Sequence, residues 1–124
     1  MTKKQASADN LITTIIKGID DVKGEEIQLL DLREIENTVC DYFIICTGGS
    51  NTQVKAISGS VRKVVGKQLQ DKPWHVEGET VAEWVLMDYV NVVVHIFQKT
   101  TREFYDIESL WGDAKITKIN ATIS

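Results

Sequence analysis

Residues 83–97 carry the sequence Glu-Trp-Val-Leu-Met-Asp-Tyr-Val-Asn-Val-Val-Val-His-Ile-Phe, which predicts two β-strands joined by a tight turn. A two-residue turn at Val90 and Asn91 gives this hairpin two different faces, because side chains alternate along a strand. One face is apolar except for a phenol, and its pairs are Tyr89 with Val92, Met87 with Val94, and Val85 with Ile96. We expect that face to lie against the core of the protein.

The opposite face of the hairpin mixes aromatic, charged and apolar side chains. Its pairs are Trp84 with Phe97, Leu86 with His95, and Asp88 with Val93. A large aromatic side chain beside a fixed charge is typical of protein interfaces. The alternative interpretation is a face covered by a helix, because single exposed apolar side chains carry no function by themselves. The residues alone leave both interpretations open.

The composition limits the classes of protein to which this chain can belong. A chain of 124 residues with 43% hydrophobic residues fits one globular domain, which buries about two-thirds of the surface that the unfolded chain exposes. The net charge of −4 argues against binding to nucleic acid through phosphate contacts. One basic cluster lies on a predicted helix and comprises Lys55, Arg62, Lys63 and Lys67. A solvated helix face is a better interpretation of this cluster than an RNA-binding groove.

The lack of a recognisable targeting segment and the spacing of the cysteines predict a cytoplasmic protein. No apolar run follows Met1, and no segment approaches the roughly 20 apolar residues of a membrane span. Cys40 and Cys46 have neither the spacing of a metal site nor that of a disulfide framework. We expect two reduced thiols, at least partly buried, on the same side of a strand.

Hydrophobic spacing and capping residues predict the remaining elements of one domain over residues 9–114. A polar tail, residues 1–8, precedes a helix that Asp9 or Asn10 caps and that ends before Gly24. Strands are predicted at 26–32, 39–47 and 74–76, and a helix capped by Ser50 or Asn51 runs to about residue 69. Within it, Gly59 and Gly66 either weaken the helix or allow close packing. A last helix covers 101–111, and residues 115–124 form a tail without a motif.

An enzyme is the main alternative class of function. The turn Gly48-Gly49-Ser50, between a strand and a helix, resembles the glycine-serine turn of nucleotidyltransferases. Those enzymes need paired carboxylates to bind the metal ions that bridge the phosphates. The chain has no Asp-x-Asp, and the nearest pattern, Glu77-Gly78-Glu79, falls at a predicted turn. The sequence therefore argues against nucleotidyl transfer.

Other chemistry is no better supported by the sequence. The glycine turn lacks the lysine and the spacing of a P-loop, although a helix N-terminus can still attract an anion. His75 and His95 are far apart in sequence and do not form a recognisable ligand set. His95 on a sheet face is more typical of a hydrogen-bonded structural histidine than of a catalytic base. We predict no catalytic residue, no cofactor and no metal site.

Four blocks of the sequence resemble the iojap family of ribosomal silencing factors. They are Glu83–Phe97, Asp41–Ile57, Arg102–Ala114 and His75–Gly78, in the same order as in the family. The resemblance extends from about Asn10 to Ala114, which is nearly the whole chain. The family usually has Gly where this chain has Val90, and a β-branched residue resists positive φ. We therefore expect a loop wider than two residues and a looser pairing of the hairpin.

The resemblance implies both a fold and a function. The fold is α/β: a single domain with a mixed β-sheet flanked by helices, nucleotidyltransferase-like without the catalytic carboxylates. The function is to bind the large ribosomal subunit through ribosomal protein L-fourteen, to block joining of the small subunit and so to repress translation. An assembly factor for the large subunit that uses the same surface is the alternative. Exposed apolar surface also allows a homodimer off the ribosome.

The hairpin provides the candidate residues for such a contact. An aromatic anchor, apolar neighbours and a fixed charge suffice for docking, without any catalytic group. A net negative protein suits a basic ribosomal protein and is repelled by ribosomal RNA, so little direct contact with nucleic acid and none with a membrane is expected. The predicted partner-binding residues are Trp84, Leu86, Asp88, Tyr89 and His95.

Overall fold

The computed structural model describes residues 7–38 and 40–119, which form helices and strands in a mixed order. The first half of the chain forms α1 (Ala8–Asp21), β1 (Glu25–Asp31), β2 (Tyr42–Gly48) and α2 (Asn51–Leu69). The second half forms β3 (His75–Glu77), β4 (Trp84–Asp88), β5 (Val92–Gln98), α3 (Lys99–Tyr105), α4 (Ile107–Leu110) and β6 (Lys115–Lys118). Within the described residues, no helix is long and apolar enough to cross a membrane.

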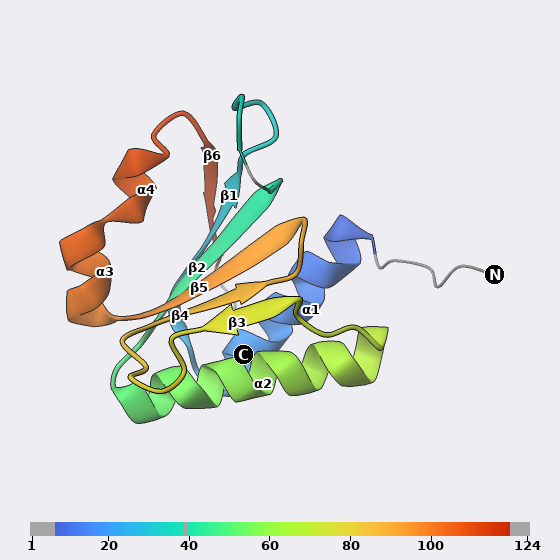
Figure 1. Ribbon diagram of the computed structural model, residues 1–124, viewed down its shortest axis with the longest axis vertical. Helices are drawn as coiled ribbons and strands as arrows, with labels where there is room; N and C mark the ends of the chain where they lie inside the picture. The colour runs from blue at the N-terminus through green and yellow to red at the C-terminus, as the bar shows by residue number, and fades with distance from the viewer. Residues whose placement is uncertain (1–6, 39, 120–124) are drawn as a thin grey trace.

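The strands form one mixed sheet in the order β3-β4-β5-β2-β1-β6 (Figure 1). β2 and β5 are parallel neighbours at its centre, and the other pairs are antiparallel. Both central strands are buried along almost their whole length, as expected for strands that are covered on two faces. The predicted α/β fold with a mixed sheet flanked by helices is confirmed.

The main core lies between the sheet and the helices α1 and α2, which cover one face (Figure 1). Ile15 and Ile19 of α1 and Ile57 of α2 are completely buried there. The two helices approach closely at Gly18, where a Cβ atom would lie 2.9 Å from the Cα atom of Val61. A larger residue at position 18 would push the helices apart, so this glycine sets their spacing.

The hairpin has the predicted register, with Trp84 opposite Phe97 and Asp88 opposite Val93. The loop is wider than two residues, as expected, because Tyr89, Val90 and Asn91 lie between β4 and β5, but the expected looser pairing of the strands is wrong. Val90 adopts a φ of 78°, and the N–H of Asn91 donates to the carbonyl of Tyr89 at 3.0 Å, which closes a γ-turn. The strained residue is tolerated inside this tight turn, and the pairing is intact.

Four predicted boundaries are corrected by the structure. Ser7, rather than Asp9 or Asn10, caps α1, because its hydroxyl accepts from the N–H of Asn10 at 3.2 Å. The predicted tail therefore overlaps α1 at Ala8, while residues 1–6 lie outside the described residues. The strand expected at 39–47 begins at Tyr42. The helix expected at 101–111 is broken by Asp106, whose φ is 44°. Residues 115–118, expected to be part of a tail, form β6 beside β1.

The cysteines are buried and free, but their relative placement differs from our expectation. Cys46 belongs to the core under α1 and α2, whereas Cys40 packs on the other face of the sheet. Cys40 precedes β2, so the alternation of strand side chains does not extend to it. Burial raises the pKa of Cys40 to about 11 and that of Cys46 to about 12, which keeps both thiols protonated at neutral pH.

Candidate functional site

The second face of the sheet is only partly covered. Ile107 of α4 and the half-buried Trp111 pack over Phe43, whereas β4 lies toward the open edge of the sheet. Along β4 the side chains alternate between buried and half-buried. Val85 and Met87 face the main core, and the half-buried residues on the second face are Trp84, Leu86 and Asp88. The hairpin thus combines one core face with one face that remains accessible.

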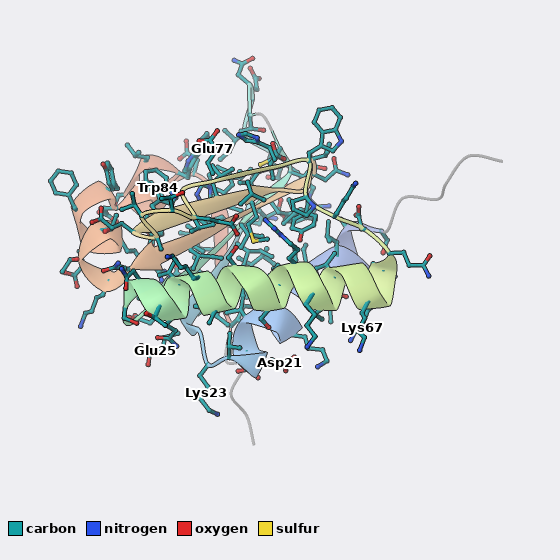
Figure 2. The ribbon with its side chains drawn as sticks, turned by 60° about the horizontal axis from the view of Figure 1, so that its bottom comes forward. Asp21, Lys23, Glu25, Lys67, Glu77 and Trp84 are labelled. Carbon is teal, nitrogen blue, oxygen red and sulfur yellow. The ribbon has the colours of Figure 1, made fainter. Side chains whose placement is uncertain are left out.

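Trp84 is fixed by aromatic neighbours from two elements. Its ring stacks on Phe97 of β5 with 4.8 Å between centroids, and Tyr105 of α3 lies 4.9 Å away. Figure 2 shows Trp84 on the side of the sheet away from α2. The indole is therefore held between the sheet and α3 while part of it stays exposed. A rigid, partly exposed aromatic side chain is well suited to anchor a partner.

His95 lies beneath Trp84 and is only 5% exposed. The indole Nε1 of Trp84 donates to Nδ1 of His95 at 3.1 Å. Phe43 contacts the imidazole edge to face, with 4.5 Å between centroids. Burial lowers the pKa of His95 to about 4, so the ring is neutral at physiological pH. His95 is hydrogen-bonded, as expected of a structural histidine, but it lies beneath the site and does not face solvent as a predicted partner-binding residue would.

Asp88 stands at the turn end of the accessible face. Its Oδ1 accepts from the backbone N–H of Val90 at 2.7 Å, so one carboxylate oxygen stabilises the γ-turn. The side chain remains half-buried and close to solvent. Asp88 therefore combines a structural contact with an accessible negative charge.

Tyr89 does not belong to the same face. It is 5% exposed and packs in the core under α1 and α2. Its hydroxyl is buried without a hydrogen-bond partner among the described residues, and burial raises the pKa of the phenol. The structure thus brings together Trp84, Leu86, Asp88 and His95, but leaves Tyr89 on the opposite side of the sheet.

The sequence prediction missed the contribution of α3 and α4 to this surface. Phe104 is 81% exposed, Leu110 is 75% exposed, and the half-exposed Tyr105 joins Phe104 to Trp84 through ring contacts. We call the surface of Trp84, Leu86, Asp88, Phe104, Tyr105 and Leu110 the docking face. The available signal was the pair Phe104-Tyr105 in a polar helix, since adjacent aromatic residues cannot both point into the core.

Arg102 fixes α3 against the sheet. Its guanidinium donates to the hydroxyl of Thr47 at 2.7 Å and to the carbonyl of Glu26 at 2.8 Å. It also forms a largely buried ion pair with Glu108 of α4 at 2.8 Å. One side chain therefore joins β1, β2, α3 and α4, and so positions the aromatic residues of the docking face.

The polar groups of the turn Gly48-Gly49-Ser50, which precedes α2, form hydrogen bonds within the protein. The hydroxyl of Ser50 accepts from the N–H of Gln53 at 3.1 Å, which caps the helix as predicted. The side-chain oxygen of Gln53 accepts from the N–H of Gly49 at 2.6 Å. The Gln53 amide also donates to the carbonyl of Lys23 at 3.0 Å. These bonds use the polar groups that a phosphate-binding loop would present to its ligand.

The acidic and basic groups elsewhere are arranged as ordinary surface pairs. Glu79 accepts from the hydroxyl of Ser58 at 2.7 Å and pairs with Arg62 at 3.3 Å, while Glu77 pairs with His75. No group of three or more metal-ligating side chains occurs within residues 7–38 and 40–119. The basic residues of α2 are exposed, and Lys67 points away from the sheet (Figure 2). The cluster is exposed, and its interpretation as a solvated helix face stays a prediction.

Comparisons with known proteins agree with this architecture. The family model described as "Ribosomal silencing factor during starvation" (RsfS) matches residues 5–123. Ribosomal silencing factor RsfS of Halalkalibacterium halodurans is 38% identical over 119 residues, which cover 95% of this chain and 99% of that protein. A crystal structure of a protein from Chromobacterium violaceum matches with a TM-score of 0.81 at 34% identity, covering 94% of this chain and 97% of the other.

A more distant relative carries a different name. The mouse protein called mitochondrial assembly of ribosomal large subunit protein 1 is 32% identical over 73 residues, which cover 57% of this chain and 32% of that protein. The family match over nearly the whole chain, the 38% identity and the common fold lead to one conclusion. The chain belongs to the RsfS family of ribosomal silencing factors.

Proposed function

We propose that this protein silences ribosomes by binding the large subunit through ribosomal protein L-fourteen and blocking the approach of the small subunit. The observation that carries the proposal is the docking face, where Trp84 stands half-buried beside the exposed aromatic residues of α3. Contiguous exposed apolar surface of this kind marks interaction sites in soluble proteins. The family membership identifies the ribosome as the partner.

Charge supports contact with a basic protein rather than with RNA. The protein has a net charge of −4, and Asp88 adds a negative group at one end of the docking face. Opposite charges accelerate the encounter and favour one orientation of the two partners. Trp84 and Leu86 then exclude water around the ion pair that Asp88 forms with Arg or Lys of the partner.

The proposed mechanism is steric and needs no catalytic group. A domain seated where the small subunit must dock prevents joining for as long as it stays bound. Its effect is set by its affinity and its concentration, because the small subunit and the factor compete for the same surface. Because the Halalkalibacterium halodurans relative is bacterial, and bacterial ribosomes lie in the cytoplasm, we propose a cytoplasmic location.

Sedimentation with separated subunits tests the proposal. The protein should migrate with the large subunit and not with the small one, and excess protein should reduce joining of the purified subunits without added nucleotide. Asp21→Lys is a matched control for charge changes at Asp88, because Asp21 is an exposed residue at the end of α1, away from Trp84 (Figure 2). Joining at the normal rate with excess bound wild-type protein would refute the steric mechanism.

The name of the mouse relative favours a second candidate, assembly of the large subunit. Such a factor would use the same docking face but prefer immature particles. Sedimentation with immature and mature large subunits separates the two, because a silencing factor binds the mature particle. Off the ribosome, we propose that the docking face pairs two copies in a homodimer, which the mass of the free protein in solution tests.

A further inference from the structure

The hydrogen bond beneath the docking face determines what Trp84 can offer to a partner. An indole has one polar atom, the N–H at Nε1, and that group can only donate. In Trp84 it points inward to Nδ1 of His95, at 3.1 Å, and not toward solvent. The exposed part of this side chain therefore presents carbon atoms alone.

Burial places the acceptor, although the other ring nitrogen of His95, Nε2, has no hydrogen-bond partner among the described residues. Because Nδ1 accepts a hydrogen bond, the neutral imidazole carries its proton on Nε2. His95 is 5% exposed and lies between the side chains of Phe43 and Phe97, so its ring cannot turn outward without opening the face. Burial, which also lowers the pKa of this ring, keeps Nδ1 unprotonated and available as an acceptor at neutral pH.

The hydrogen bond adds a constraint that stacking does not supply. Phe97 and Tyr105 restrict the plane of the indole, but a turn of about 180° about χ2 would keep that plane and exchange the two edges of the ring. The bond from Nε1 to His95 fixes that rotation and so fixes which edge of the ring is exposed. A partner then meets a prepared anchor, and less side-chain freedom is lost on binding.

We infer that His95 is a positioning residue for docking, because it fixes the orientation of Trp84 and accepts the indole N–H. The partner then receives the indole in an apolar recess that contains no hydrogen-bond acceptor. This inference rests on the proposed function of the docking face. It defines the recess as aliphatic or proline-rich, with the cation that meets Asp88 beside it. A buried acceptor in such a recess would lack a donor and would weaken the complex.

Four variants test the role of His95: Trp84→Phe, His95→Phe, His95→Asn and the double variant Trp84→Phe with His95→Phe. Affinity for purified large subunits is measured by sedimentation, and each variant is first checked for a cooperative melt. His95→Phe leaves the indole N–H bonded to water, which docking must remove, and we expect affinity to fall about tenfold. In the Trp84→Phe background the same change should alter affinity by less than about twofold, since no N–H remains.

The conservative variant and a spectroscopic signal separate positioning from general damage to the fold. Asn at position 95 offers an oxygen close to the place of Nδ1, and His95→Asn should bind within about threefold of wild type. In the free protein, the indole N–H signal of Trp84 should exchange slowly with solvent in wild type and His95→Asn, but quickly in His95→Phe. Trp84→Phe serves only as the background of the double variant, because it removes ring surface as well as the N–H.

The outcomes distinguish this inference from the proposed function. If wild-type protein does not bind large subunits, the proposed function fails, and the docking role of His95 fails with it even where the exchange data confirm the bond. If wild type binds and His95→Phe binds equally well, the positioning role is overturned while the docking face stands. If His95→Phe weakens binding as much in the Trp84→Phe background as in wild type, the effect does not depend on the indole N–H and the positioning role is also overturned. Should His95→Phe fail to fold, His95→Asn decides: binding close to wild type with slow exchange of the indole N–H supports the positioning role, and a loss of tenfold or more despite slow exchange overturns it.

Discussion

The carboxylate of Asp88 accepts a hydrogen bond from the backbone N–H of Val90 at 2.7 Å, across the tip of the β4–β5 hairpin. The same side chain is half-buried on the docking face. A substitution at Asp88 therefore changes both the charge of the face and the support of the turn. Asn retains an oxygen that can accept from Val90, so Asp88→Asn isolates the effect of charge.

We expect Asp88→Asn to weaken the block of subunit joining and Asp88→Lys to abolish it. Asn removes an attraction, whereas Lys also places a positive charge against a basic partner and loses the turn contact. The rate of joining of purified subunits with excess protein measures both effects. Asp21→Lys, with the same change of charge on α1, should behave as wild type. Equal blocking by all the proteins would place the docking surface elsewhere, with Lys55 on α2 the next candidate.

Trp84→Ala should fold but bind large subunits about thirtyfold more weakly, a loss of about 2 kcal/mol, as is typical of an interface anchor. Because Trp84 also stacks on Phe97, we expect a loss of about 2 kcal/mol in the free energy of unfolding, less than for a fully buried Trp. Chemical denaturation and sedimentation measure the two quantities. Lys67→Ala, on the exposed side of α2, should change neither. Undiminished binding by a stable Trp84→Ala variant would exclude Trp84 as the anchor.

Val90→Gly should stabilise the protein by about 1 kcal/mol, which corresponds to a rise in Tm of about 4 °C. Val90 has a φ of 78°, a conformation that glycine adopts without strain, although glycine also gains entropy in the unfolded chain. Val90→Ala, which keeps a Cβ atom, should gain less. Calorimetry measures the three melting temperatures. A lower Tm for Val90→Gly would mean that contacts of the valine side chain outweigh the backbone strain.

The stability should fall as the pH is lowered from about 7 to about 4, in part because of His95. Its pKa is about 4 in the folded protein against an ordinary value of 6.5, so the unfolded chain binds the proton more readily between these values. The linked loss in the free energy of unfolding approaches about 3 kcal/mol. Denaturant unfolding across this range should give a shallower decline for His95→Asn than for wild type. Parallel curves would mean that His95 titrates normally in the folded state.

The turn at Gly48-Gly49-Ser50 should not bind ATP or GTP with Mg²⁺. The Gly49 N–H and the Ser50 hydroxyl are already bonded to Gln53, and the chain has no Asp-x-Asp to bind the metal ions. Titration calorimetry should show no heat of specific binding. Micromolar binding that is lost in Ser50→Ala would restore the enzyme hypothesis, provided that a melt shows the variant to be folded without its helix cap.

Local patterns were sufficient to predict much of this fold. The alternation along 84–97 gave the hairpin register and separated the core face from the accessible face, and Ser50 was correctly predicted as a helix cap. The contact of Gly18 with Val61 could not be predicted, because it depends on how two helices cross. Gly59 and Gly66, expected either to weaken α2 or to allow close packing, have no atom nearer than 3.9 Å to an added Cβ. The strand β6 was missed because four residues that are all exposed show no hydrophobic pattern.

The docking face was only partly predictable for a similar reason. Trp84, Leu86 and Asp88 share a face through the period of a single strand, which a sequence displays directly. Phe104 and Tyr105 join them through long-range contacts of Arg102, and those depend on the finished fold. Tyr89 was included among the partner-binding residues although its own alternation places it on the core face, and its burial removes it from the docking face.

The contacts of Arg102 also bear on the order in which the protein acquires its binding surface. They reach back 76 positions to Glu26 and 55 positions to Thr47, so they are among the most non-local bonds in the fold. Non-local contacts form late, because closing a long loop costs entropy before the contact rewards it. We expect the aromatic side chains of α3 to take their places only after the sheet is assembled. An incompletely folded molecule would then present Trp84 without the support of Tyr105, and finished copies would compete for the ribosome more effectively.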